Sequence, residues 1–157
     1  TMIKNSPNLG TGDVTLRNDP RVTRVGKYLR ETKINELPQL FNIFIGNISI
    51  VGPRPLMRVG FNRYSQNFQN TIYNIKPGLT GIGSIVFRDE EKILTESNLP
   101  PHECYQKIIL PHKGRLELWY QKNMSLVLDL KLIFLTFWVI LFKNSKLHKH
   151  ILKNLPE

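Results

Sequence analysis

The sequence predicts a predominantly helical α+β domain with short β segments. Apolar side chains recur at steps of three and four residues in several segments, which is the period of a helix with one buried face. Brief β-like runs lie between turn signals. The chain has 157 residues, of which 41% are apolar, enough for one ordinary hydrophobic core. We therefore expect residues 1–157 to form a single domain.

The first two helices are expected within residues 19–44. Asp19 is a suitable N-cap and Pro20 a suitable first helical residue. Apolar residues follow at near-helical spacing: Val22, Val25 and Leu29. A second stripe has the spacing of a buried helical face: Ile34, Leu37, Phe41 and Phe44. Proline is tolerated only in a first helical turn, so Pro38 places the start of this helix near residues 33–36.

The middle of the chain is expected to alternate short strands and short helices. A turn signal at 46–47 precedes a brief β-like run at 48–51. A helical stripe then extends over 57–70. Proline and glycine punctuate an extended segment at 77–87, and residues 89–94 are expected to form a short helix.

Two helices are expected in the last third of the chain. The first continues from Lys113 and has three large apolar residues on one face: Leu116, Trp119 and Tyr120. The second, 126–142, contains only three polar residues: Asp129, Lys131 and Thr136. It is shorter than the roughly 20 apolar residues that cross a bilayer. It is either a core helix or a helix lying in a membrane interface, and its aromatics and the lysines that follow favour the interface.

The composition restricts the partners. The chain has 22 Lys and Arg against 12 Asp and Glu, a formal net charge of +10, so anionic partners are expected. A nucleic-acid binder would need aromatic side chains along a positive face, whereas helical packing explains the aromatics here. The single cysteine, Cys104, excludes an internal disulfide framework and suits a reducing compartment. The four histidines do not have metal-ligand spacing.

Four motifs lie in order within the first half of the chain: TM at 1–2, RETKINELPQ at 30–39, ISIVGPRP at 48–55 and KPGLTG at 76–81. Together they resemble the KFRTM, LRxTxxDELPQ, MSxVGPRP and KPGxTG motifs of the bacterial sugar transferases. Each motif alone is weak evidence. Their order and spacing along one chain are specific.

The resemblance implies a membrane-associated, monotopic phosphoglycosyl transferase. Such an enzyme moves a sugar 1-phosphate from a UDP-sugar to undecaprenyl (polyprenyl) phosphate and thereby initiates surface polysaccharide synthesis. The implied location is the cytoplasmic face of the bacterial inner membrane, an anionic surface. By this resemblance, the family's amino-terminal re-entrant membrane helix is expected to be missing from the sequence, and the catalytic domain is expected to be incomplete at its amino-terminal end.

One departure from the family pattern concerns the expected catalytic pair. Where the family usually has Asp-Glu, this chain has Asn35-Glu36. The family's aspartate attacks the β-phosphorus of the donor and forms a covalent intermediate, and a carboxamide is a poor nucleophile for such a step. We expect Glu36 and Asn35 to be the catalytic residues, with Glu36 as ligand of Mg²⁺ in a direct or altered transfer.

Two alternatives to this assignment stay open. A different carboxylate can be the nucleophile, and the candidates are Asp89, Glu90 and Glu91. Alternatively, the chain is a catalytically inactive relative that acts as a membrane adaptor. Helix capping by Asn35 and a favourable first-turn charge on Glu36 would also account for both residue types without catalysis.

The phosphates of the donor are expected to meet Arg54. Two prolines fix its backbone, and its guanidinium suits bidentate binding of phosphate. Unpaired N–H groups at the start of the second helix would bind the same diphosphate. The resemblance implies further substrate-binding residues: Arg30, Lys76, Gly78, Thr80, Gly81 and Arg88. A surface salt bridge for Arg54 and a plain turn at 76–81 are the structural alternatives.

Overall fold

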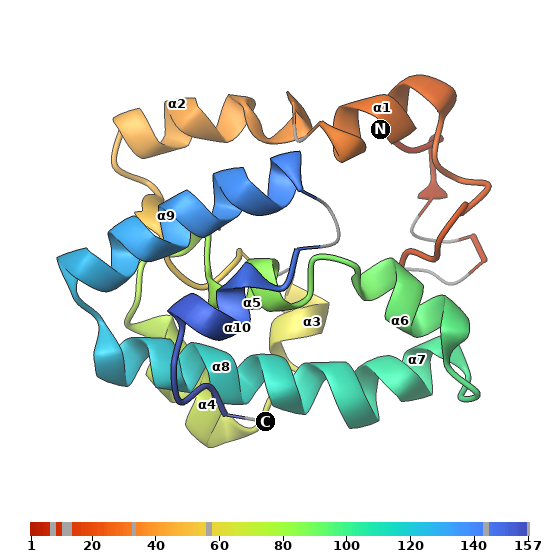
Figure 1. The fold of residues 1–157 in the computed structure, drawn as a ribbon. Coiled ribbons are helices and arrows are strands. Elements are labelled where there is room, and N and C mark those ends of the chain that lie inside the picture. The colour runs from red at the N-terminus through yellow and green to blue at the C-terminus, as the bar shows by residue number, and fades with distance from the viewer. Residues whose placement is uncertain (7–8, 11–13, 33, 56–57, 143–144, 157) are drawn as a thin grey trace.

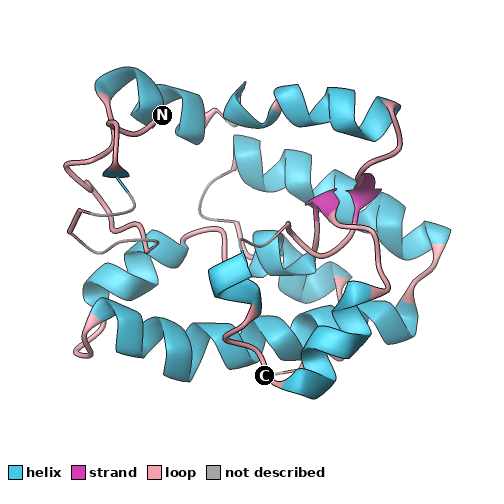
Figure 2. Ribbon diagram, turned by 180° about the vertical axis from the view of Figure 1, so that it is seen from behind, coloured by secondary structure: helices cyan, strands magenta, loops and turns pink. Residues whose placement is uncertain are grey.

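The computed structural model of the protein (Figure 1) describes residues 1–6, 9–10, 14–32, 34–55, 58–142 and 145–156. Helices make up most of the described chain, together with one two-stranded sheet (Figure 2). The helical elements are α1 (Arg24–Glu31), the 3-10 turn η2 (Ile34–Glu36), α2 (Pro38–Phe44), α3 (Arg58–Phe61), α4 (Gln66–Tyr73), α5 (Ile82–Val86), α6 (Glu90–Glu96), α7 (Pro101–Cys104), the π turn η3 (Tyr105–Ile109), α8 (Leu110–Asn123), α9 (Leu126–Leu141) and α10 (Leu147–Ile151). The prediction of a mostly helical fold with short β segments is confirmed.

The sheet consists of β1 (Ser49–Val51) and β2 (Gly78–Thr80), which pair in parallel. Ser49 lies opposite Gly78 and Val51 opposite Thr80, so the strand expected at 48–51 is present. The two backbones approach closely, because a side chain at Gly78 would collide with the backbone of Gly52. Glycine is therefore required here by the packing of the sheet itself.

The segment after β2 differs from the prediction. An extended conformation is expected up to residue 87, but residues 82–86 form α5. The reason is tertiary, because α5 packs between α8 and α9 and buries the side chains of Ile82 and Ile85 completely or almost completely. Such burial outweighs the weak helix propensity of a short Gly- and Ile-rich run.

The core lies between α5, α8 and α9. In Figure 1, α8 runs across the lower part of the molecule, and α5 and α9 lie above it. The largest fully buried side chains belong mainly to this layer: Ile82, Ile109, Leu116, Tyr120, Leu132 and Leu135. The Tyr120 hydroxyl donates a hydrogen bond of 2.8 Å to Asp129 Oδ1 and so ties α8 to α9.

Residues 101–123 form one uninterrupted helical rod made of α7, η3 and α8. The helix predicted from Lys113 therefore begins earlier. Pro111 has no N–H to donate to the preceding turn, and the π turn at Tyr105–Ile109 accommodates it by widening the helix just before it.

Asp19 does not cap a helix, contrary to the prediction. The helix α1 begins at Arg24, and its N-cap is Thr23, whose Oγ1 accepts the Gly26 N–H at 2.9 Å. Asp19 instead forms a buried two-point ion pair with Arg21, with N–O distances of 2.9 and 2.6 Å. The Arg21 guanidinium also donates to three backbone carbonyls, those of Ser6, Leu9 and Val14.

The helix α2 also differs from the prediction. It begins at Pro38, and the residue before it, Leu37, makes no side-chain cap. Asn35 and Glu36 lie in the separate turn η2, so neither caps α2, and residue 33 is outside the described residues. No residue of α2 is buried. The stripe that was expected to face the core is exposed, and Phe44 at its end is 90% exposed.

The helical stripe expected at 57–70 is two helices, α3 and α4, and residue 57 is outside the described residues. Ser65 separates them and caps α4 by accepting the Phe68 N–H at 3.4 Å. The short helix expected at 89–94 is present as α6.

The apolar stretch predicted at 126–142 forms α9, which ends at Leu141. One face of α9 is buried against the core: Leu128, Leu132, Leu135 and Val139. The other face is exposed and apolar: Leu126, Val127, Leu130, Phe134, Phe137 and Leu141. Among the described helices none has both the length and the apolar character needed to cross a bilayer.

Candidate active site

Three cavities meet at two arginines. The first, the polar cavity, has a volume of about 520 Å³ and is lined by Arg30, Asn35, Glu36, Arg54, Arg88, Asp89 and Glu91, among others. The second, the aromatic cavity, has a volume of about 510 Å³ and is lined by Tyr64, Phe68, Ser84, Phe87, Tyr105 and Glu117, among others. The third, the apolar groove, has a volume of about 500 Å³ and is lined by Leu37, Leu40, Ile50, Leu79, Ile133 and Phe137, among others. Arg54 and Arg88 line all three.

Glu36 is held by two neighbours. Its Oε1 accepts from Arg54 at 2.8 Å, and its Oε2 accepts from the Gln39 side-chain amide at 2.7 Å. The Glu36 side chain is 14% exposed and the Arg54 side chain 50% exposed. The loop that carries Arg54 and the turn η2 before α2 therefore lie next to each other, as the sequence predicted. Among the described residues, Glu36 is the one carboxylate that lines both the polar cavity and the apolar groove.

The amides at the start of α2 do not take part in the way predicted. The Leu37 N–H already donates to the Ile34 carbonyl at 3.1 Å within the η2 turn, and the Leu40 N–H donates to the Leu37 carbonyl at 3.0 Å. These two N–H groups are therefore not available to an anion, whereas side-chain cations line the cavity.

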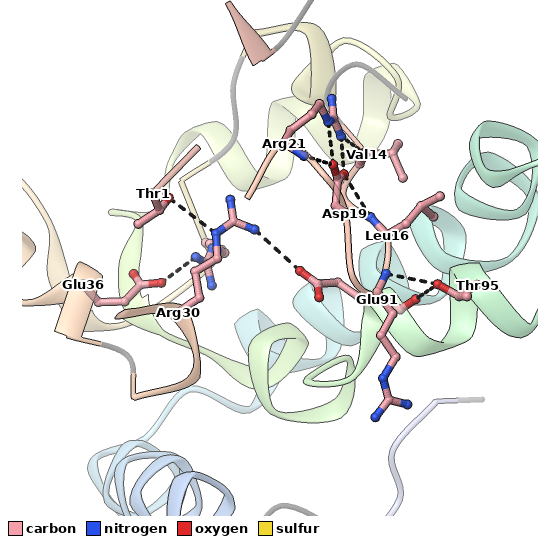
Figure 3. Close-up of polar contacts among 11 residues, drawn as sticks. Thr1, Val14, Leu16, Asp19, Arg21, Arg30, Glu36, Glu91 and Thr95 are labelled. Carbon is pink, nitrogen blue, oxygen red and sulfur yellow. Dashed lines mark hydrogen bonds and ion pairs between the residues drawn. The ribbon is translucent and has the colours of Figure 1, made fainter. Parts of the chain in front are cut away.

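Arg30 crosses the polar cavity from the last turn of α1. Its Nε donates to Thr1 Oγ1 at 3.4 Å, and its guanidinium pairs with Glu91 Oε1 at 3.6 Å. Figure 3 shows this arginine between Glu36 on one side and Glu91 on the other. Both contacts are long and partly solvated, so a phosphate entering the cavity can displace them at small cost.

Arg88 follows α5 and pairs with no other described residue. Burial lowers its pKa, and the adjacent Asp89 carboxylate opposes this shift. Guanidinium stays charged even so. An unpaired, partly buried cation at the junction of three cavities is the strongest candidate for binding an anionic ligand.

Asn35 points its amide into a region where its oxygen has no partner. The Asn35 Oδ1 is buried and accepts no hydrogen bond from any described residue. Within the described part of the chain, no three His, Cys, Asp or Glu side chains come together as metal ligands. Asn35 Oδ1 and Glu36 nevertheless fit Mg²⁺, because this ion commonly takes only one or two protein oxygens and completes its shell with phosphate and water.

The three alternative carboxylates lie in different places. Asp89 and Glu91 line the polar cavity. Glu90 faces the aromatic cavity and forms an ion pair with Lys113, so it does not share the polar cavity with the others.

The KPGLTG segment lies apart from the polar cavity. Lys76 Nζ donates to the Gly46 carbonyl at 3.1 Å and lines none of the three cavities described above. Gly78 and Gly81 serve the close approach to Gly52. Thr80 Oγ1 lies 2.6 Å from Thr136 Oγ1 and connects β2 with α9 beside the apolar groove.

Sequence reasoning singled out the charged residues that the aromatic cavity shares with its surroundings, but it gave no functional role to Ser84, Tyr105 or Glu117. The most informative of these is Glu117, a buried carboxylate whose pKa is raised to about 7, chiefly by desolvation. A signal existed, because Gly114, Glu117 and Tyr120 lie three residues apart and share a buried helix face. A charge on such a face rarely lacks a specific partner.

Comparisons with known proteins agree with the motifs. The family described as bacterial sugar transferase matches residues 1–143. A UDP-galactose-lipid carrier transferase of Erwinia amylovora is 34% identical over 133 residues, which is 85% of this chain and 24% of that protein. A UDP-glucose:undecaprenyl-phosphate glucose-1-phosphate transferase of Klebsiella pneumoniae is 40% identical over 123 residues, 76% of this chain and 24% of the relative.

An undecaprenyl-phosphate galactose phosphotransferase of Salmonella typhimurium is likewise 34% identical over 133 residues. This chain matches 24% of the length of each of these three relatives. The family match covers the polar cavity, both arginines and the apolar groove, and the relatives match over most of this chain. The chain therefore belongs to the bacterial sugar transferase family.

Proposed function

We propose that this protein transfers a sugar 1-phosphate from a UDP-sugar to undecaprenyl phosphate, releases UMP and so initiates surface polysaccharide synthesis. The observation that carries the proposal is the position of Arg54 and Arg88 between a polar cavity and an apolar groove. A reaction between a charged nucleotide sugar and a phosphate on a hydrocarbon chain needs this combination. The relatives named for transfer of sugar phosphates to undecaprenyl phosphate support it.

In this proposal the apolar groove holds the first isoprene units of the acceptor. Apolar residues line it from the start of α2, from both strands and from α9, including Leu40, Ile50 and Phe137, and Arg54 and Arg88 also line it. An acceptor chain in the groove would place its phosphate beside the two guanidinium groups. Their positive charge offsets the repulsion between the acceptor phosphate and the donor diphosphate.

The same two helices are proposed to rest on the membrane. α2 and α9 lie next to each other on one side of the molecule in both views (Figure 1 and Figure 2). Both carry exposed apolar residues, including Phe41, Phe44, Phe134 and Phe137. Apolar side chains together with a net charge of +10 favour an anionic lipid surface, which we propose is the cytoplasmic face of the bacterial inner membrane.

The reacting carboxylate is proposed to be Glu36. It lies where donor and acceptor would meet, next to Arg54. In a covalent route, a Glu36 oxygen attacks the β-phosphorus, the bond to the UMP oxygen breaks, and an oxygen of the acceptor phosphate then displaces Glu36. In a direct route, an oxygen of the acceptor phosphate attacks the same phosphorus and the bond to the UMP oxygen breaks, while Glu36 would serve as a ligand of Mg²⁺.

Mg²⁺ is proposed to bind with the diphosphate, and Glu36 and Asn35 Oδ1 would be its protein ligands. When bound, the ion supplies charge neutralisation at the phosphoryl oxygens. Asn35 in this role supplies a neutral oxygen, which suits a ligand better than a nucleophile. The unpartnered Oδ1 supports this assignment.

The first test measures UMP release from UDP-glucose or UDP-galactose with undecaprenyl phosphate and Mg²⁺ in detergent or vesicles. We expect Glu36→Gln to lower turnover by at least about a hundredfold, because removal of a reacting or charge-binding group usually costs about 3 kcal/mol or more of transition-state stabilisation. Arg88→Met should lower it to a similar extent. The control is Arg24→Met, since Arg24 is exposed on α1 and lines none of the three cavities.

Peptide mass spectrometry of the enzyme quenched during turnover separates the two routes. A phosphosugar adduct on Glu36 indicates the covalent route, and turnover without an adduct indicates direct transfer. An adduct on Asp89 or Glu91, or full activity of Glu36→Gln, would remove Glu36 from the reacting position.

The second candidate function is a catalytically inactive membrane adaptor. Asn35 favours it, because the family's usual nucleophile is missing at this position. An adaptor would bind vesicles but release no UMP with any UDP-sugar in the presence of Mg²⁺ and acceptor, so the same assay decides between the two functions.

A further inference from the structure

The aromatic cavity contains two buried polar atoms that lack partners. Glu117 is 8% exposed, and its Oε2 accepts no hydrogen bond from any described residue. Ser84 Oγ, on α5, is buried and equally without a partner among them. A buried polar atom that is left unpaired costs about 1–3 kcal/mol. Both residues line the same cavity, so one ligand can satisfy both atoms.

The backbone of α5 holds the carboxylate of Glu117 in place. The Gly83 N–H donates a backbone hydrogen bond to its carboxylate. A side chain at Gly83 would place its Cβ 2.7 Å from Glu117 Oε1, so glycine is what allows the carboxylate to approach α5. One oxygen is therefore used by the fold, and the other remains available to a ligand.

The walls of the cavity are flat and aromatic. Tyr64 stacks on Phe68 with ring centroids 4.0 Å apart. Tyr105 begins the π turn, and Lys113 Nζ lies 5.6 Å from the centroids of both Tyr105 and Phe87. Aromatic walls around a polar floor suit a planar heterocycle that hydrogen-bonds through its edge. π turns are also frequent at functional sites.

The cavity opens toward the phosphate-binding groups. Arg54, Arg88 and Glu91 line both the aromatic cavity and the polar cavity. A ligand with a planar ring and a phosphate chain can therefore place the ring near Glu117 and the phosphates at the two arginines. Its volume of about 510 Å³ lies within the range of small-molecule sites.

We propose that the aromatic cavity binds the nucleobase of the donor, and that Glu117 and Ser84 select an imide edge such as that of uracil. The imide N–H donates to Glu117 Oε2, and an adjacent carbonyl oxygen accepts from the Ser84 hydroxyl. Cytosine presents an acceptor at the same ring position, which would leave the Glu117 oxygen unpaired. This inference rests on the proposed function, because that function supplies the nucleotide.

The test measures binding of UDP, CDP and N3-methyl-UDP to the whole protein by calorimetry, with Mg²⁺ present. We expect UDP to bind at least about tenfold more tightly than either analogue, because each analogue lacks the donor and leaves a buried acceptor unpaired. In Glu117→Gln the preference for UDP over CDP should fall toward one, since the carboxamide can also donate to cytosine. Glu96→Gln is the matched control, because Glu96 is an exposed carboxylate that pairs with Lys92 of its own helix.

Equal binding of UDP, CDP and N3-methyl-UDP to the wild-type protein would overturn the proposal. So would an unchanged UDP preference in a Glu117→Gln protein whose thermal unfolding shows that it is folded. The analogue series alone decides the matter if that variant does not fold.

The transfer assay keeps the two proposals separate. Loss of UDP selectivity in Glu117→Gln together with a raised donor KM and a nearly unchanged kcat supports a base-binding role. If the wild-type protein selects UDP through Glu117 but never releases UMP, the proposal of a nucleobase site stands and the proposal of transferase activity is refuted. If the wild-type protein and Glu117→Gln both release UMP with the same donor KM, the proposal of transferase activity stands and the base-binding role of Glu117 is refuted.

Discussion

Buried charges are the residues of this protein whose roles depend most on tertiary contacts. Glu117 is a carboxylate on a helix face that otherwise packs against the core, and burial raises its pKa to about 7 from 4.5. Asp19 shows the opposite shift, to about 2, because Arg21 donates side-chain and backbone hydrogen bonds to it. The sign of each shift follows from whether the carboxylate has a cationic partner.

Glu117 gives the stability of the protein a defined pH dependence. A raised pKa means that the folded protein binds the proton more tightly than the unfolded chain, so this contribution is complete below about pH 4.5 and is lost as the pH rises through about 7. The loss amounts to about 3 kcal/mol at most. We expect Glu117→Gln to flatten the fall in unfolding free energy between pH 5 and pH 8, measured by urea titration. Parallel pH profiles for the two proteins would contradict the assignment.

The sequence indicated some of these residues and not others. Arg54 and Glu36 could be singled out because short motifs carry them, and the expectation that both motifs meet one diphosphate predicted that they lie close together. Glu117, Ser84 and Tyr105 come from three separate elements, α8, α5 and η3, and their convergence depends on how those helices pack. No local pattern encodes such a convergence.

At the scale of the elements, a buried ion pair organises the segment before α1. Arg21 joins Asp19 to carbonyl groups of residues 6, 9 and 14, and Val14 of the same segment is buried in the core. We expect Asp19→Asn to lower the unfolding free energy at pH 7 by about 2 kcal/mol. The wild-type protein should lose the same amount as the pH falls from 3.8 through about 2.

Urea unfolding at pH 7 and at pH 2.5 measures this effect, with Glu96→Gln as the exposed control. The difference between Asp19→Asn and wild type should shrink at the lower pH, because Asp19 becomes partly protonated there. An equal difference at both values would assign the loss to packing rather than to charge.

The elements also show where periodicity is informative and where it is not. The spacing of apolar residues correctly predicted a helix containing Phe41 and Phe44, but the same spacing was wrong about burial. Periodicity indicates that a helix has an apolar face, whereas a neighbouring element decides whether the protein covers that face. The strand at 48–51 was predictable because its β-branched residues lie between two clear turn signals.

For the whole molecule, the exposed apolar side is expected to control membrane binding. The double variant Phe41→Ser and Phe44→Ser should weaken binding to phosphatidylglycerol-containing vesicles by at least about tenfold, since each buried aromatic side chain is worth about 1.5–3 kcal/mol. Co-sedimentation with the vesicles measures the affinity. Ile108→Ser is the matched control, because Ile108 is exposed on η3, in the helical rod on the far side of the molecule from α2 (Figure 1).

Equal losses in Ile108→Ser and in the double variant would contradict a defined membrane-facing side. Binding by charge alone would show a different pattern, because it would survive the double variant and disappear at high salt.

The shared position of Arg54 and Arg88 also matters for inhibitor chemistry. Three small fragments, one in the polar cavity, one in the aromatic cavity and one in the apolar groove, would each lie close to the guanidinium groups of Arg54 and Arg88. A flat heterocycle, an anionic diphosphate isostere and a branched hydrocarbon can therefore be joined by short linkers that meet beside these two arginines. Linking turns the second and third binding events into intramolecular ones, so weak fragments combine into a tight compound without any new contact being built.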